Sequence, residues 1–120
     1  MAINIDTIET VLLDNGFAFA HETAKYKELI HSDSGESVYL NKADPKTYSQ
    51  LIVHPRHLDQ RTQLIGSGRG IGSSSETRFG SNLRKFPEAV NRGAKPSPYG
   101  VPFGFESAES LKVFVADVFG

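Results

Sequence analysis

The sequence predicts an α+β fold: a small antiparallel sheet of three to five strands, packed by N- and C-terminal helices, with a long basic Gly/Ser-rich loop. Amphipathic helix patterns lie near both ends of the chain, and alternating apolar residues around a turn-forming cluster indicate a hairpin. The segment 66–100 is rich in glycine, serine and proline. With 120 residues, the chain is expected to form a single domain, 1–120, with an irregular basic segment at 66–100.

The first helix is expected over residues 7–15. Asp6 can cap it, with Glu9 three residues later in the position of a capping box. Gly16 stands where helices commonly end. Phenylalanine and alanine then alternate over residues 17–20, which is typical of a short strand.

A hairpin is expected next, with strands at 26–31 and 37–40 and a turn between them at 32–36. Asp33 and Glu36 in this turn are interpreted as solubilising surface residues. A further strand is expected at 48–53, before Pro55.

The second half contains weaker signals followed by one strong helix. A short helix is expected at 56–65, a loop at 66–75, one helical turn at 82–86 and a strand at 101–105. Ser107 is expected to cap the last helix. The buried stripe of that helix has the spacing i, i+3, i+4, i+7 and consists of Leu111, Phe114, Val115 and Val118.

The charge is unevenly distributed along the chain. The net charge is −1, but residues 1–40 carry two Lys/Arg against seven Asp/Glu, whereas residues 41–95 carry ten against four. A basic middle with spaced arginines suits a phosphate backbone, so the first hypothesis is a nucleic-acid-binding module. The predicted contacts are Arg56, Arg61, Arg69, Arg78, Arg84, Lys85 and Arg92.

The segment Leu12-Leu13-Asp14-Asn15-Gly16-Phe17 has the pattern Leu-x-x-x-Gly-Phe, and a hairpin is expected around Gly35. With these two elements, residues 8–40 resemble HicA-type toxins, whose fold is similar to that of double-stranded-RNA-binding domains. Where the family has its catalytic Gly-Ser-His, this chain has Ala24-Lys25-Tyr26. The resemblance therefore favours an α-β-β-β-α core and an RNA-like ligand, without assigning RNA cleavage.

Two alternatives to nucleic-acid binding stay open. His54 and His57 could serve as acid and base beside Arg56 and Arg61, as a metal-independent ribonuclease or toxin would require. The favoured interpretation is that His54 ends a strand and His57 starts a helix, both at the surface. The basic segment could instead dock on an acidic protein surface, as in an interaction or inhibitor protein.

The aromatic residues of the basic segment allow two interpretations. Phe79 and Phe86 stand next to cations, which is typical of single-stranded nucleic-acid binding, or they anchor the loop in the core. For Phe86, which precedes a proline, the anchor is favoured.

No cofactor and no metal site are expected. The glycines at 66–72 match no nucleotide-binding fingerprint in the required strand–helix context. The chain has no cysteine and no apolar run of about 20 residues, so we expect a cytoplasmic protein without a membrane span.

Overall fold

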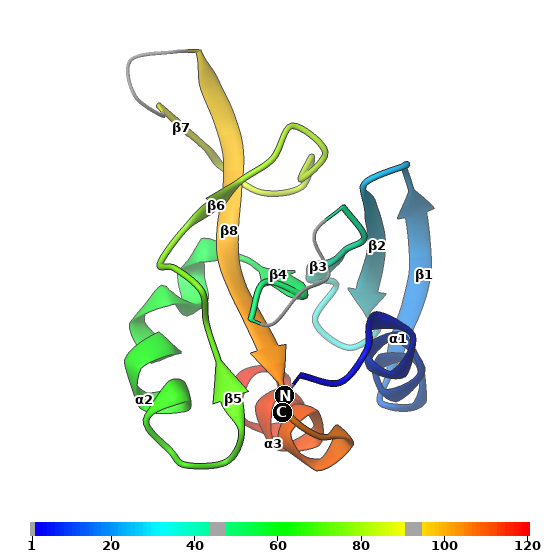
Figure 1. Cartoon of the computed structure of the whole chain (residues 1–120). Coiled ribbons are helices and arrows are strands. Elements are labelled where there is room, and N and C mark those ends of the chain that lie inside the picture. Colours follow the sequence, from blue (N-terminus) through cyan, green and yellow to red (C-terminus); the bar gives the residue numbers. More distant parts are fainter. Residues whose placement is uncertain (1, 44–47, 91–94) are drawn as a thin grey trace.

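The computed structural model describes residues 2–43, 48–90 and 95–120 (Figure 1). Arg92, one of the predicted contacts, lies outside these residues. The elements in chain order are α1 (Ile5–Asp14), β1 (Phe17–Glu22), β2 (Tyr26–His31), β3 (Ser37–Asn41), β4 (Leu51–Val53), the 3₁₀ helix η1 (Pro55–Gln60), α2 (Arg61–Ile65), β5 (Ile71–Gly72), β6 (Arg78–Phe79), β7 (Glu88–Val90), β8 (Pro96–Phe105) and α3 (Ala108–Phe119).

The strands form an antiparallel sheet in the order β1-β2-β3-β4-β8-β5, and β6 and β7 also pair with β8. The predicted α+β class is confirmed, but the residues that the structure describes form eight strands, more than the three to five expected. Figure 1 shows β8 running through the middle of the fold, with short strands along it. This one strand therefore connects the N-terminal meander to the basic segment.

Both terminal helices contribute to one apolar core on the sheet. Ile8 and Leu12 of α1 are fully buried in the same cluster as Leu111 and Phe114 of α3. The ring of Phe114 packs on Phe103 and Phe105 of β8, with ring centroids 4.9 and 5.1 Å apart. No helix among the described residues has the length and apolar character needed to cross a bilayer.

The N-cap of α1 differs from the sequence prediction, whereas that of α3 agrees with it. Asn4, not Asp6, caps α1: its side chain accepts a hydrogen bond from the Thr7 amide at 2.8 Å, and Asp6 lies in the first turn. The helix begins earlier because Asn4 has the extended backbone of a cap residue. Ser107 caps α3 as predicted, accepting from the Ser110 amide.

The part of the basic segment around Leu83 and Phe86 packs on the second face of the sheet. Leu83 and Phe86 are 0% and 5% exposed and join Tyr26, Tyr39 and Ile52 in a second apolar cluster. The Lys85 amide donates to the Tyr39 hydroxyl at 3.0 Å, and burial raises the pKa of Tyr39 to about 12. Phe86 is therefore the core anchor that was favoured from the sequence.

The prediction that residues 66–100 are irregular is correct only in part. The segment contributes β5, β6 and β7, and β8 begins at Pro96 instead of residue 101. The expected helical turn at 82–86 is instead two successive turns, in which Leu83 bonds to Gly80 and Phe86 bonds to Leu83 through their backbones. Pairing with the distant β8 orders residues whose own composition favours a loop.

The prolines explain why the strands along β8 are short. The Tyr99 amide donates toward β7, whereas the Pro98 carbonyl accepts from Gly80 on the side of β6. Because successive residues of a strand face opposite edges, the backbone nitrogens of the even-numbered residues of β8 face β5 and β6. Pro98 and Pro102 have no N–H to offer on that side. Pairing with β6 and with β5 is accordingly confined to residues 99–100 and 104–105.

Replacing Gly100 by alanine tests the contact between the basic segment and the sheet. A Cβ at Gly100 would lie 2.6 Å from both Ile52 Cγ2 and the Val53 carbonyl oxygen, and 2.9 Å from the Phe86 ring. We expect Gly100→Ala to lower the free energy of unfolding by about 1–3 kcal/mol in urea denaturation, because backbone must move to make room.

Gly80→Ala is the matched control, since a Cβ there would meet nothing closer than the Tyr26 hydroxyl at 3.1 Å. Equal losses in the two variants would contradict the close packing at Gly100.

Candidate functional site

A pocket of about 220 Å³ opens where the basic segment passes the β2–β3 turn. It brings together three parts of the chain that are distant in sequence: the turn, the start of η1 and the basic segment. Its lining includes Glu36, Ser37, His54, Arg56, Lys85 and Phe86. Two of the predicted cations and one predicted histidine therefore meet in one place.

His54 holds the start of η1. Its Nδ1 accepts a hydrogen bond from the Arg56 amide at 3.0 Å, and its ring packs against Phe86 at 5.4 Å. Burial, helped by the nearby charge of Arg56, lowers the pKa of His54. Because Nδ1 is an acceptor, the neutral ring carries its proton on Nε2. His54 is thus a neutral donor in the lining of the pocket.

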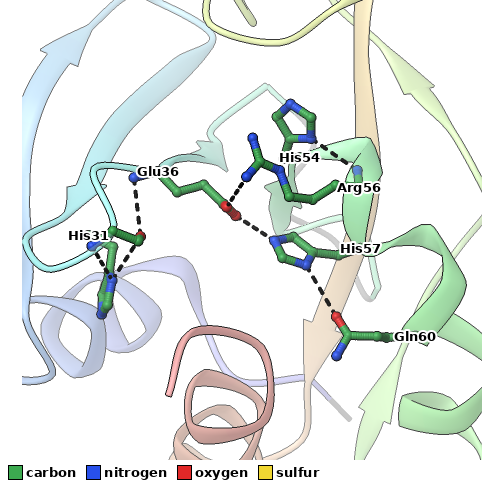
Figure 2. Close-up of polar contacts among 7 residues, drawn as sticks. His31, Glu36, His54, Arg56, His57 and Gln60 are labelled. Carbon is green, nitrogen blue, oxygen red and sulfur yellow. Dashed lines mark hydrogen bonds and ion pairs between the residues drawn. The ribbon is translucent and has the colours of Figure 1, made fainter.

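His57 is only 8% exposed, and both of its ring nitrogens are occupied (Figure 2). Nε2 contacts Glu36 Oε2, and Nδ1 lies 3.2 Å from Gln60 Oε1. The ring also stands edge-on to Phe119 of α3. His57 therefore ties the β2–β3 turn to η1. A ribonuclease that uses two histidines needs both rings at the substrate. Acid–base catalysis by His54 and His57 stays a prediction.

Glu36 is shared between two partners. Its Oε1 lies 3.4 Å from Arg56 Nη1, while its other oxygen contacts His57 (Figure 2). The side chain of Glu36 is 10% exposed and that of Arg56 is 61% exposed. The interpretation of Glu36 as a solubilising turn residue is therefore wrong, because the arrival of η1 encloses it.

A fully buried carboxylate lies next to the pocket. Glu28 of β2 is 1% exposed; it accepts from Arg84 Nε at 3.1 Å and from the hydroxyl of Ser37, a pocket residue, also at 3.1 Å. Arg84 itself is about half exposed. Sequence reasoning missed Glu28, although strict alternation along β2 places it on the same face as Tyr26 and Ile30.

The other predicted cations among the described residues have partners away from this pocket. Arg61 donates to Ser73 and to the Ser75 carbonyl, and Arg69 pairs with Asp117 at 3.7 Å. Arg78 lies in β6, where it pairs with Gly100 of β8. Of the six predicted contacts that the structure describes, Arg56 and Lys85 line the pocket. Arg84 precedes Lys85 and pairs with Glu28, which is bonded to the pocket residue Ser37. We refer to Arg56, Arg84 and Lys85 as the rim cations.

The two phenylalanines of the basic segment, Phe79 and Phe86, have different surroundings. Phe79 stacks on Tyr99 with ring centroids 5.6 Å apart, and both rings are half-buried. Phe79 is therefore absent from the two apolar clusters, unlike Phe86.

The family model described as "Protein of unknown function (DUF2002)" matches residues 1–119, nearly the whole chain. The chain belongs to the DUF2002 family. The comparison with curated proteins gives no match. Because the family description names no activity, the resemblance of residues 8–40 to HicA-type toxins stays a prediction.

A larger pocket of about 400 Å³ lies on the other side of η1 and α2. It is lined by Gln60, Gln63, Leu64, Ser67, Arg69 and Asp117. Its one cation is paired with its one carboxylate, so the pocket has no excess charge to attract a phosphate. Among the described residues, no group of three or more His, Asp or Glu side chains is placed to hold a metal ion.

The cap at His54 predicts a pH dependence of stability. The pKa of His54 is lower in the folded chain than in the unfolded chain, where it is about 6.5, so the unfolded state binds the proton more readily. The resulting stability is fully present above that pH and is lost as the pH falls. We expect the free energy of unfolding to decrease below about pH 6.5.

His54→Asn isolates this contribution, because asparagine can accept the Arg56 amide without titrating. As the pH falls, the wild type should lose stability relative to His54→Asn, so the difference between their free energies of unfolding should change across the acid range. Curves that stay parallel would show that His54 is not the titrating group.

Proposed function

We propose that the protein binds nucleic acid through the rim cations, with the phosphate backbone lying across the pocket. The observation that carries the proposal is that Arg56 and Lys85, from two separate segments of the chain, line one hollow, with Arg84 next to Lys85 in the sequence. Guanidinium and ammonium groups are the side chains that neutralise phosphates in such complexes.

The two arginines are held in place before any ligand arrives. Arg84 contacts Glu28 through Nε, and Arg56 contacts Glu36 through Nη1. Each guanidinium has five N–H donors, so each keeps donors for a phosphate oxygen. A side chain that is already ordered loses less conformational entropy on binding, which supports a site at these residues.

Lys85 is fixed at its backbone and free at its tip. Its amide donates to the Tyr39 hydroxyl, and its neighbour Phe86 is buried in the second apolar cluster. The side chain itself is exposed. The ammonium group can therefore reach a phosphate, while the backbone beneath it keeps the position of the rim.

The number of rim cations sets the expected salt dependence. Three phosphate contacts correspond to a slope of log affinity against log salt of about −2 to −3. Seven contacts, as the sequence predicts, would give a slope about twice as steep. The difference is large enough to show whether the other four cations take part.

Gel-shift titrations with single- and double-stranded DNA and RNA at about 50 mM and about 200 mM salt test the proposal. Arg56→Gln and Lys85→Gln should each weaken binding and reduce the salt slope by about one. Lys112→Gln is the matched control, since it removes the same charge from an exposed position on α3.

Equal weakening by Lys112→Gln would mean that net charge, and not the rim, governs binding. Absence of a shift with every nucleic acid at the lower salt concentration would contradict the proposal and would favour an acidic protein partner.

A further inference from the structure

Phe79 and Tyr99 form an aromatic pair outside both apolar clusters. They stand opposite each other in the register of β6 and β8, so both rings lie on the same face of the sheet. Their ring centroids are 5.6 Å apart, and the two ring planes are inclined by 32°. Both side chains are half-buried, so the pair keeps part of its aromatic surface in contact with water.

The neighbours of the pair on this face are small. Ala89 of β7 stands opposite Ser97 of β8, and alternation along β8 places Ser97 on the same face as Tyr99. Figure 1 shows this end of β8 extending, together with β7, beyond the three helices. The side chains of alanine and serine do not rise as far from the sheet as the two rings, so a flat ligand can approach the rings from this side.

The charges around the pair favour an anionic ligand. Glu88 is the one carboxylate among the described residues of β6, β7 and β8, and it stands opposite Pro98, which alternation places on the other face. Lys95 is exposed and directly precedes β8, at a position that alternation places on the face of Ser97 and Tyr99. Aromatic rings with a nearby cation are the combination that binds single-stranded nucleic acid, because bases stack on the rings and the cation neutralises the backbone.

We propose that the Phe79–Tyr99 pair stacks against unpaired bases, so that the ligand of the rim cations is a single strand of nucleic acid. The inference rests on the proposed nucleic-acid binding and names its substrate class. Phosphate contacts at the rim are available to any nucleic acid, whereas the aromatic pair adds a contact that requires exposed base faces.

The pair lies close to the rim along the backbone. The Tyr99 amide donates to the Pro87 carbonyl at 3.1 Å, and Pro87 is two residues after Lys85. A strand whose phosphates contact Lys85 can therefore place a neighbouring base on the pair.

The rim and the pair lie on opposite faces of β8, which favours a flexible ligand. A Cβ at Gly100 would lie 2.9 Å from the ring of Phe86, a pocket residue, whereas the side chain of the preceding Tyr99 points to the other face. A ligand that contacts both must bend around the edge of the sheet beside β7. A single strand can make this bend, but a short duplex resists it, since duplex DNA has a persistence length of about 50 nm.

The test compares two rhodamine-labelled oligomers of about ten residues by fluorescence anisotropy at about 50 mM salt. One is an oligothymidylate, and the other is an abasic oligomer with the same number of phosphodiesters, so the two differ only in their bases. We expect the wild type to bind the oligothymidylate at least about fivefold more tightly, which is the effect of one stacked base.

Phe79→Leu and Tyr99→Leu should each reduce this preference by lowering the affinity for the oligothymidylate. The affinity for the abasic oligomer should stay unchanged, which also shows that the variants are folded. Tyr99→Phe keeps the ring and should keep the preference. Phe19→Leu is the matched control, since it removes the same ring from β1, where Phe19 is 58% exposed.

The outcomes separate the two proposals. Equal wild-type affinities for the two oligomers overturn the stacking role of the pair and leave the proposed phosphate binding intact. A preference that persists in both leucine variants, or that Tyr99→Phe or Phe19→Leu abolishes, also overturns the stacking role. Absence of wild-type binding to either oligomer overturns both proposals.

Discussion

The rest of the structure depends on the pairing of β8 on both of its edges. β4 and β7 lie along one edge, and β5 and β6 lie along the other. This arrangement brings the basic segment back onto the sheet, where Leu83 and Phe86 join the second apolar cluster and the Phe86 ring lies over Gly100. Without β8, neither the second apolar cluster nor the rim of the pocket would have a surface to form on.

Two carboxylates, the buried Glu28 and the partly buried Glu36, connect this packing to the site. A buried charge is costly unless it is paired, and Glu28 and Glu36 obtain their partners from Arg84, Arg56 and His57. The basic segment and η1 therefore have two roles. Their cationic side chains neutralise Glu28 and Glu36, and the remaining guanidinium N–H groups face outward. In the rest of the described chain, most cationic side chains form ion pairs or hydrogen bonds away from this pocket.

The sequence predicted the elements whose signals are local. The hairpin, the last helix with its Ser107 cap, and the anchoring role of Phe86 follow from alternation, helical spacing and neighbouring residues. The site could be predicted only in outline: Arg56, Lys85 and His54 were identified, whereas Glu28, Glu36 and Ser37 were not. A carboxylate in a strand or turn looks the same in the sequence whether a distant segment covers it or not.

By itself, the sequence determined the fold class, the helical and hairpin periodicities and the concentration of cations in the middle of the chain. The tertiary structure alone decided that residues 66–100 add strands to the sheet, and which cations share a surface. The physical reason is that strand pairing with β8 and the ion pairs of Glu28 and Glu36 join residues many positions apart, with energies that no local pattern encodes.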